Sequence, residues 1–352
     1  MLGVEHRGQP AGRSEVTIDR AALRSNIRRL REVLGAAELW AVVKANAYGH
    51  GAETVAATAL EEGAAVLCVA TVGEGIELRA AFPAARILVL SPAFPFEYPA
   101  AREARLELAF ADGPLPGGIP LHAKVDTGMG RWGMQADVAS SPDVIGLMSH
   151  LASADTDRAF TDRQIARFAE IAASHPGLTR HLANSAGILR FPAARFDAGR
   201  AGIALYGLSP FGTDPSEDGL RPVLSWRSAV GQVKLLRPGE GTGYGRRFIA
   251  AEPTWIGIVP VGYGDGFRRG LTGTHVLVVG ERRPVVGTIS MDSFAVLLPG
   301  PVAPGSPVTL IGDGLPAEEH AAVLGTITYE LSCGIDSSPA RARRVVVDQA
   351  IA

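Results

Sequence analysis

Lys44 is one of only three lysines in the chain, and the remaining Lys/Arg residues are all arginines. Arginine stays protonated and cannot serve as an amine nucleophile, whereas lysine loses its proton readily when it is desolvated. Lys44 ends the apolar run 39–43 and is followed by the glycine-containing segment 45–51. A lysine at the tip of a buried strand, facing a glycine-rich loop, is the arrangement that a Schiff-base enzyme needs. The run alone is equally compatible with a lysine that caps a strand and reaches out to water.

Other polar segments follow short apolar runs in the same way, and they are Asp126–Arg131, His150, Asn184–Gly187 and Arg200–Ile203. If the runs are strands of a barrel, these groups share the rim formed by the carboxyl ends of the strands, where barrel enzymes place their chemistry. The last two segments would follow strands seven and eight, the usual place for a phosphate. Backbone N–H groups and a hydroxyl at the start of a helix bind anions. Together with Lys44, these segments predict an active site on one rim.

The elements that would position these groups repeat along the first part of the chain. After a short strand at 16–18, apolar runs alternate with helical or turn stretches such as 20–34, 53–62, 74–81 and 161–174. The eight candidate barrel strands are 39–44, 66–71, 86–90, 106–110, 119–125, 144–150, 179–184 and a short one at 196–200. This repetition is typical of an α/β protein with an N-terminal (β/α)8 TIM-type barrel. The alternative on pattern alone is a doubly wound open sheet.

The pattern changes after about Pro210, where strand-like runs continue but long helices vanish. The predicted strands are 229–236, 254–261, 275–279, 283–286, 294–298, 308–311 and 345–348, with one helical stretch at 318–324. Glycine and proline separate them at short intervals, as expected for antiparallel β structure. The polar segment 213–219 is a turn-forming boundary. The sequence therefore predicts a barrel domain over 1–215 and a mostly antiparallel C-terminal β domain over 216–352.

Composition narrows the functional class. The chain has 352 residues and a net charge of −2, with no basic stretch interleaved with aromatics, so we expect no nucleic-acid partner. Cys68 and Cys333 lie far apart, so neither a zinc site nor a disulfide framework is expected, and no metal is predicted. The N-terminus lacks the apolar centre of a signal peptide, and no apolar run is long enough to span a membrane. We expect a cytoplasmic protein.

The segment 41–51, Ala-Val-Val-Lys-Ala-Asn-Ala-Tyr-Gly-His-Gly, resembles the pyridoxal-phosphate lysine signature of alanine racemases. The resemblance continues in the family's order through Lys124–Arg131, His150–Asp155, His181–Ser185, Arg200–Gly207, Gly243–Gly245, Gly262–Gly266, Ser290–Asp292 and Thr328–Glu330. It implies a barrel, a C-terminal β domain and a head-to-tail homodimer with shared active sites. The implied activity is the pyridoxal 5′-phosphate-dependent interconversion of L-alanine and D-alanine, an isomerase reaction that supplies D-alanine for cell-wall peptidoglycan.

The resemblance also implies a role for each site residue. Lys44 would hold the cofactor as a Schiff base and act as one base, while Tyr244 of the partner subunit would be the other. Racemisation by two bases needs this geometry, because one group removes the α-proton and another delivers a proton from behind. An ordinary tyrosine has a pKa of about 10, so its surroundings must stabilise the phenolate. His150 and Arg200 are implied to form a hydrogen-bonded chain toward that phenol. Without the resemblance, Tyr244 reads as a strand aromatic in a glycine-rich turn.

Arg200 is further implied to bind the pyridine nitrogen, where most such sites use a carboxylate. An arginine cannot accept a proton, so the nitrogen stays unprotonated and the ring is a weaker electron sink. Arg131 is implied to bind the substrate carboxylate through its fork of N–H groups. The residues implied to bind the phosphate or line the substrate pocket are Tyr48, Ser185, Gly202, Ile203, Tyr329 and Met291. Each of these alone is more often structural, as a helix cap, half-buried packing or core.

Some positions depart from the family. The segment between Arg131 and His150 is short, so a barrel helix there is expected to be reduced. Thr288 stands where the family commonly has an arginine at the substrate entrance, and Asp336–Arg341 keeps only the proline and a displaced arginine of the C-terminal motif. Lys124 matches a position that some members carbamylate. Tyr263, Tyr329, Asp155 and Arg269 match positions that narrow the entrance.

These departures leave other functions open. One alternative is a broader racemase that acts on serine or other small amino acids, which the altered entrance motivates. Another is a decarboxylase of the same barrel type, which Arg200 disfavours because decarboxylation benefits from the stronger electron sink. A third alternative, from a different class, is a non-catalytic carrier of the cofactor.

Overall fold

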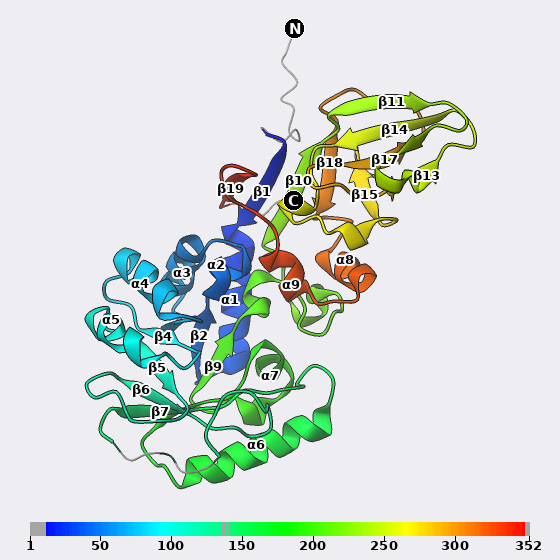
Figure 1. Ribbon diagram of the computed structural model, residues 1–352. Coiled ribbons are helices and arrows are strands. Elements are labelled where there is room, and N and C mark those ends of the chain that lie inside the picture. The colour runs from blue at the N-terminus through cyan, green and yellow to red at the C-terminus, as the bar shows by residue number, and fades with distance from the viewer. Residues whose placement is uncertain (1–11, 136–137, 139–140, 349–352) are drawn as a thin grey trace. The chain divides into compact units, whose positions relative to one another are not determined.

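The chain folds into two compact units in the computed structural model, which describes residues 12–135, 138 and 141–348 (Figure 1). Ala22–Arg221 form the barrel unit, and the residues before and after that range form the second unit. The division differs from the predicted ranges at two places. Strand β1 (Ser14–Asp19) belongs to the second unit, and residues 216–221 belong to the barrel unit.

Eight parallel strands close the barrel in sequence order, each pairing with the next and β9 pairing with β2. The strands are β2 (Glu38–Val42), β3 (Val66–Val69), β4 (Ile87–Val89), β5 (Glu107–Phe110), β6 (Leu121–Lys124), β7 (Val144–Met148), β8 (Thr179–His181) and β9 (Ala198–Ala201). Each lies within or overlaps one of the eight predicted runs. The predicted (β/α)8 barrel is confirmed, and the doubly wound open sheet is wrong because β9 closes the ring onto β2.

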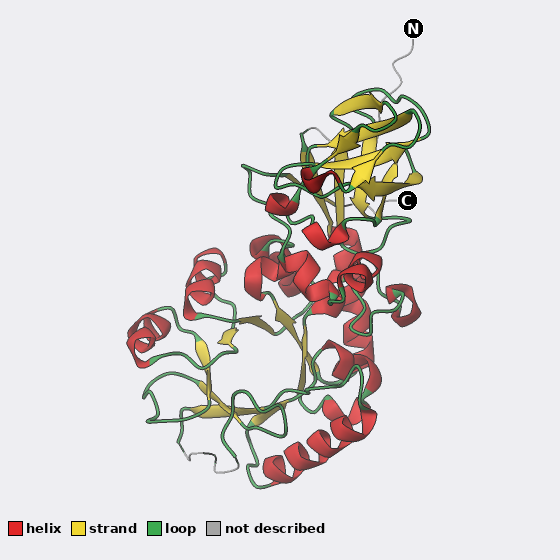
Figure 2. Ribbon diagram, turned by 45° about the vertical axis from the view of Figure 1, so that its right-hand side comes forward, coloured by secondary structure: helices red, strands yellow, loops and turns green. Residues whose placement is uncertain are grey.

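Helices lie outside the ring of strands (Figure 2). They are α1 (Arg20–Leu34), α3 (Ala52–Glu61), α4 (Val72–Ala81), α5 (Tyr98–Glu103), α6 (Arg158–Ala173) and α7 (Ser185–Arg190). The short segment α2 (Lys44–Tyr48) is instead a left-handed turn that follows β2. Local capping explains where two of the helices begin. The Thr71 hydroxyl accepts the Glu74 N–H at the start of α4, and the Asp157 carboxylate accepts the Phe160 N–H at the start of α6.

The connection between β6 and β7 has no helix among its described residues, 125–135, 138 and 141–143, which agrees with the expected reduction. The loop folds back on the end of β6 instead. The Met134 N–H donates to the Lys124 carbonyl at 2.9 Å, and the Asp126 carboxylate accepts the N–H groups of Gly128 and Gly130 at 2.8 and 3.1 Å. The Asp126–Arg131 segment is therefore anchored at its start.

The second unit is built on a nine-stranded sheet in the order β11-β14-β17-β16-β15-β18-β10-β1-β19, which is antiparallel except for the parallel pair β1–β19. Its further strands are β10 (Leu224–Ala229), β11 (Gln232–Leu236), β14 (Thr254–Val259), β15 (His275–Val278), β16 (Glu281–Val286), β17 (Phe294–Leu298), β18 (Pro307–Ile311) and β19 (Arg343–Val347). A small ribbon of β12 (Gly241–Thr242) and β13 (Phe248–Ile249) and the helices α8 (Ala317–Leu324) and α9 (Thr328–Cys333) complete it. The predicted antiparallel β domain is confirmed.

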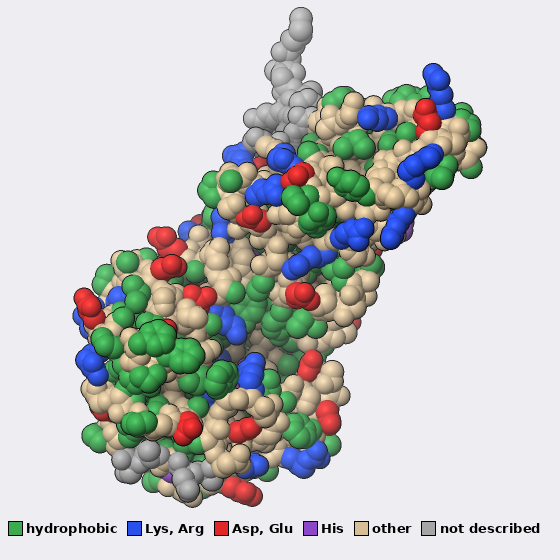
Figure 3. All heavy atoms as spheres, in the orientation of Figure 1, with side chains coloured by type: hydrophobic (Ala, Val, Ile, Leu, Met, Phe, Trp, Pro, Cys, Tyr) green, Lys and Arg blue, Asp and Glu red, His purple; other side chains and the backbone are tan. Residues whose placement is uncertain are grey.

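The surface carries acidic and basic side chains interspersed over the face shown in Figure 3. Hydrophobic side chains gather on this face of the barrel unit near α5. In the sequence, α5 follows Phe94 and Phe96, which are exposed and stack on each other. Within the described ranges, every helix is too short or too polar to cross a bilayer.

Candidate active site

Lys44 lies two residues beyond the end of β2, at the carboxyl-terminal rim of the barrel, and its side chain is half-buried. The backbone that follows is left-handed from Ala45 to Tyr48, with φ between 50° and 54° at four successive residues that are not glycine. This conformation costs about 1–2 kcal/mol per residue for L-amino acids. Such strain persists only where surrounding contacts impose it, and it gathers at functional sites.

Two side chains hold this left-handed turn. Glu74, at the start of α4, accepts the Ala45 N–H at 2.7 Å, and Asn46 accepts the Ala52 N–H at 2.9 Å. Because both ends of the turn are fixed, Lys44 and Tyr48 are held on a rigid segment rather than on the open loop that the glycines of 45–51 suggested.

Tyr48 and Ser185 converge on the backbone that follows β9. The Ser185 hydroxyl accepts the N–H groups of Gly202 and Ala204 at 3.0 and 3.3 Å. The Tyr48 hydroxyl lies so close to Gly202 that a Cβ there would sit 2.7 Å from it. The Tyr48 ring packs on Tyr206, at 5.0 Å between ring centroids. The N–H groups of Gly202 and Ala204 and the hydroxyls of Ser185 and Tyr48 thus lie close together after the last two barrel strands. The sequence predicted an anion site at this place, with Ile203 as one of its residues.

Arg200, on β9, is almost fully buried. Its guanidinium donates to the carbonyls of His181, Ser149 and Leu182 at 2.6, 2.6 and 3.1 Å. It also contacts His181 Nδ1 at 2.7 Å and His150 Nδ1 at 3.4 Å. Burial lowers the pKa of Arg200 to about 10, so the group stays protonated at neutral pH. The predicted pair of His150 and Arg200 is in contact.

The rim of the barrel is rich in positive charge. Lys124 is buried at the end of β6 and donates to the Leu90 carbonyl at 2.9 Å. Burial, with the charges of Arg200, Arg131 and Lys44, lowers its pKa to about 7. Burial and Arg200 also lower the pKa of His150 well below its ordinary value. The Arg131 side chain is exposed. Four basic side chains, those of Arg200, Arg131, Lys124 and Lys44, act on one neutral histidine, and this positive charge favours an anionic ligand.

The other predicted residues lie in the second unit. Tyr244 begins a short turn between β12 and β13, and 74% of its side chain is exposed. The Thr288 hydroxyl donates to the Tyr244 carbonyl at 2.8 Å. Met291 is half-exposed, and its carbonyl accepts the Gly264 N–H at 2.9 Å. Tyr329 is half-buried on α9.

The displaced arginine of the C-terminal motif has a partner in the same unit. Arg341 forms an ion pair with Asp292 at 2.8 Å and approaches Asp265 at 3.6 Å. It therefore joins the segment after Met291 to the Gly262–Gly266 loop, two of the segments that carry the family resemblance.

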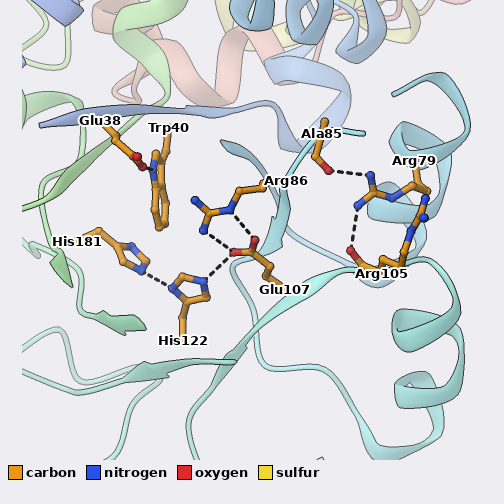
Figure 4. A network of polar contacts seen from close by, with 9 residues as sticks. All are labelled: Glu38, Trp40, Arg79, Ala85, Arg86, Arg105, Glu107, His122 and His181. Atoms are coloured by element: carbon orange, nitrogen blue, oxygen red, sulfur yellow. Dashed lines mark hydrogen bonds and ion pairs between the residues drawn. The ribbon is translucent and has the colours of Figure 1, made fainter. Parts of the chain in front are cut away.

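Sequence reasoning missed several buried polar residues of the barrel interior. His122, His181 and Glu107 form a hydrogen-bonded network with Arg86 beneath Arg200, and none was among the predicted site residues (Figure 4). The only signal was their position: His181 opens one of the resembling segments, and His122 lies two residues before Lys124 on β6.

Two family models match this chain. The model described as "Alanine racemase, N-terminal domain" matches residues 18–210, and the model described as "Alanine racemase, C-terminal domain" matches residues 223–345. Alanine racemase from Symbiobacterium thermophilum is 40% identical over 353 residues, covering 90% of this chain and 93% of that protein.

Solved structures agree with the family models. Alanine racemase from Streptomyces coelicolor A3(2) superposes with a TM-score of 0.87 at 37% identity, covering 96% of this chain and 98% of that one. Alanine racemase from Bartonella henselae, solved with covalently bound pyridoxal phosphate, gives a TM-score of 0.86 at 28% identity, covering 95% and 99% of the two chains.

The residues at the barrel rim fit this cofactor. Pyridoxal phosphate is an anionic aldehyde, so it needs an amine, an anion cradle and positive charge around it. Lys44 offers the amine, and Ser185 with the N–H groups after β9 offers the cradle. Gly202 leaves the space between the backbone and the Tyr48 hydroxyl that a Cβ would fill. With this fit and with both halves of the chain matched, the chain belongs to the alanine racemase family of pyridoxal-phosphate-dependent isomerases.

Proposed function

We propose that this chain interconverts L-alanine and D-alanine, with Lys44 and Tyr244 as the two groups that remove and deliver the α-proton from opposite faces. The observation that supports it most is the lysine at the barrel rim, held on a rigid turn that also carries Tyr48 into the anion cradle of Ser185 and Gly202. Pyridoxal phosphate, when bound, withdraws electron density from the α-carbon and so makes its proton acidic.

Lys44 would hold the cofactor covalently, because it directly precedes the left-handed turn that carries Tyr48 into the anion cradle. Ser185, together with the N–H groups of Gly202 and Ile203, would hold the phosphate, with Tyr48 and Tyr329 as hydroxyl donors. The Ser185 hydroxyl accepts the Gly202 N–H at 3.0 Å, so the two groups lie next to each other after the last two barrel strands.

Arg200 would donate a hydrogen bond to the ring nitrogen of the cofactor. Because a guanidinium donates and never accepts, this contact leaves the nitrogen unprotonated and limits electron withdrawal. A limited sink is sufficient for proton exchange and disfavours side reactions such as transamination. The same argument disfavours the decarboxylase.

His150 would connect Arg200 to the phenol of Tyr244. Its Nδ1 lies 3.4 Å from the guanidinium, and the lowered pKa keeps the His150 ring neutral. The positive charge of Arg200 therefore polarises this ring. A positive potential stabilises a phenolate, which Tyr244 must become in order to accept a proton at neutral pH.

Tyr244 would serve the active site of a second copy. It is 74% exposed on its own chain, and large exposed aromatic side chains are enriched at interfaces between proteins. The working enzyme would be a homodimer with shared active sites, in which Arg131 binds the substrate carboxylate and the Met291 backbone lines the pocket. Cys68 and Cys333 are thiols rather than halves of a disulfide, which fits the reducing cytoplasm, where we place the enzyme.

The visible spectrum of the purified protein tests the attachment. We expect an absorbance band that disappears on borohydride reduction and leaves the label on Lys44. Colourless protein, or a label on Lys124, would contradict the proposal.

Replacing the second base tests the mechanism. Tyr244→Phe should abolish L/D interconversion while the absorbance band remains, because the cofactor stays attached to Lys44. Unchanged interconversion and α-proton exchange in Tyr244→Phe would reject the two-base mechanism.

The comparison of kcat/KM for alanine and serine tests the substrate. We expect a preference for alanine. A preference for serine would favour the broader racemase that the departure at Thr288 suggests.

A further inference from the structure

Five polar side chains form one continuous hydrogen-bonded chain inside the barrel, here called the interior chain: Arg200, His181, His122, Glu107 and Arg86. Arg200 Nη1 lies 2.7 Å from His181 Nδ1, and His181 Nε2 lies 2.9 Å from His122 Nδ1. His122 Nε2 lies 2.9 Å from Glu107 Oε2, and Arg86 Nε donates to Glu107 Oε1 at 2.8 Å. Figure 4 shows the links from His181 to Arg86. Five different positions of the barrel wall contribute.

The interior chain is sealed from water over most of its length. His122 and His181 are completely buried, Glu107 and Arg200 nearly so, and only Arg86 reaches the surface. The Trp40 ring packs against His181 at 4.3 Å and against His122 at 5.6 Å between ring centroids. On β7, residue 146 is glycine, and a Cβ there would overlap the His122 ring. Gly146 therefore provides the space that the His122 imidazole occupies inside the barrel.

The direction of every proton in the interior chain follows from Arg200. A guanidinium only donates, so His181 Nδ1 must accept. The remaining proton of a neutral His181 is then on Nε2, which donates to His122 Nδ1. By the same step the His122 proton is on Nε2 and points at the Glu107 carboxylate, which also accepts from Arg86. Neither imidazole can gain a second proton without placing two donors face to face.

The electrostatics agree with this assignment. Burial lowers the pKa of His181 well below its ordinary value, and burial also lowers that of His122, so both rings are neutral. Burial alone would raise the pKa of Glu107, but the hydrogen bonds from His122 and Arg86 outweigh it and bring the pKa to about 2. Cys68, on the neighbouring strand β3, has its thiol pKa raised to about 12 by burial and is neutral too. Between the two arginines, Glu107 carries the negative charge.

We propose that Glu107, His122 and His181 are positioning residues for Arg200, which they hold in place and whose positive charge they partly compensate through two polarised imidazoles. The inference rests on the proposed contact of Arg200 with the cofactor's ring nitrogen. A carboxylate in direct contact with Arg200 would compete with the ring nitrogen for the same N–H groups. A carboxylate behind two neutral rings weakens the positive charge without itself occupying an N–H group of Arg200.

The interior chain makes Arg200 a weaker hydrogen-bond donor toward the cofactor. Hydrogen bonds in a chain polarise one another, by roughly 10–30% per bond. The negative end of His181 faces Arg200, so the guanidinium presents less than a full positive charge to the ring nitrogen. A weaker donor draws less electron density from the ring, which extends the argument that Arg200 limits the electron sink.

The first test reads the tautomers directly in the holoenzyme. Protein labelled with ¹⁵N-histidine should contain two buried rings protonated at Nε2 that do not titrate between about pH 6 and pH 9. His122→Phe should remove one of these signals and shift the other. A signal from either ring with the proton on Nδ1, or a titration near pH 6.5, would overturn the proposal.

The second test measures how the charge near Arg200 affects the pKa of the bound cofactor. Glu107→Gln removes the negative charge, so Arg200 becomes more positive and disfavours the protonated form of the bound cofactor. The pKa reported by the cofactor's visible absorbance should fall by on the order of one unit, the effect of one charge at an effective dielectric near 20. His122→Phe cuts the interior chain but leaves Glu107 with Arg86, so it stays informative if Glu107→Gln fails to fold, and it should shift the pKa in the same direction.

Glu38→Gln is the matched control. Glu38 lies at the same end of the barrel as Glu107, and its carboxylate accepts the Trp40 N–H at 2.8 Å (Figure 4). Glu38 is exposed and its charge is screened by water, so this variant removes one negative charge without breaking the interior chain and should shift the absorbance pKa far less than Glu107→Gln does. Equal shifts in all three variants would overturn the proposal. The tautomer measurement needs no turnover, so failure of the proposed function, seen as wild-type protein without racemase activity, is told apart from failure of the interior chain.

Discussion

Thr288 acts on Tyr244 through the backbone. Its hydroxyl donates to the Tyr244 carbonyl at 2.8 Å, and the residue is buried. Thr288→Val keeps the shape and removes this bond, which is worth about 1 kcal/mol. If the bond fixes Tyr244 for proton transfer, kcat should fall about fivefold while KM stays the same. Steady-state kinetics in both directions measure this.

The control for Thr288 is Thr254→Val, which removes an equivalent bond from a hydroxyl to the Glu252 carbonyl at 2.7 Å on β14. It should leave kcat unchanged. A rise in KM without a change in kcat in Thr288→Val would instead place Thr288 in substrate binding, which is the role that its position at the family's entrance suggests.

Lys124 should react with carbon dioxide near neutral pH. Its pKa of about 7 leaves the amine about half neutral at that pH, and the neutral amine adds carbon dioxide to form a carbamate and release a proton. The product carries a negative charge, which the cations Arg200, Arg131 and Lys44 stabilise. Acidification below pH 7 protonates the amine and should reverse the reaction.

The measurement for Lys124 is carbon NMR of the enzyme in ¹³C-bicarbonate. One carbamate signal should appear above pH 7 and fade below it. Lys124→Met should remove the signal, whereas Lys234→Met, at an exposed position on β11, should keep it. A signal that survives in Lys124→Met would contradict the assignment.

At the scale of elements, the left-handed turn after β2 stores strain that a glycine would release. Ala45 is exposed and has φ 50°. Ala45→Gly removes a steric cost of about 1–2 kcal/mol and adds roughly 0.5–1 kcal/mol of unfolded-state entropy. The free energy of unfolding should therefore rise by up to about 1.5 kcal/mol, measured by urea denaturation.

Ala57→Gly is the control for the turn. Ala57 lies on the right-handed helix α3, where glycine brings no steric relief and should cost about 1 kcal/mol. Equal destabilisation in both variants would mean that the turn at Ala45 is not strained.

The left-handed turn is also a feature that the sequence did not predict. Apolar runs predicted the barrel strands, because parallel strands covered by helices bury both of their faces. Nothing local predicts four left-handed residues without a glycine. The contact that supports them comes from Glu74, 29 residues beyond Ala45. The interior chain is hidden for the same reason, since His122 and His181 are 59 residues apart and meet only when the barrel closes.

At the scale of the whole molecule, the chain passes between its two units twice, after Ala21 and after Arg221. The apolar residues of 16–18 predicted a strand, but not its partners. Strand β1 pairs with β10 and β19, more than 200 residues later, and Val16 and Ile18 are fully buried there. The polar segment 213–219 predicted a boundary nearby, yet Asp218 forms an ion pair with Arg190 inside the barrel unit. Distant pairings, rather than local turn signals, decide where the units divide.

The proposed homodimer with shared active sites predicts that two inactive variants restore each other. Lys44→Ala and Tyr244→Phe would each destroy both sites of their own homodimer. In a mixed dimer one site carries both substitutions and the other carries neither. Random pairing at equal amounts gives half mixed dimers with one intact site each, so co-expression should recover about a quarter of wild-type activity. Co-expression of Lys44→Ala with Lys44→Met, which leaves no intact site in any dimer, should recover none. If the first pair also stays inactive while mixed dimers form, Tyr244 and Lys44 must come from the same chain, and the exposure of Tyr244 would need another explanation.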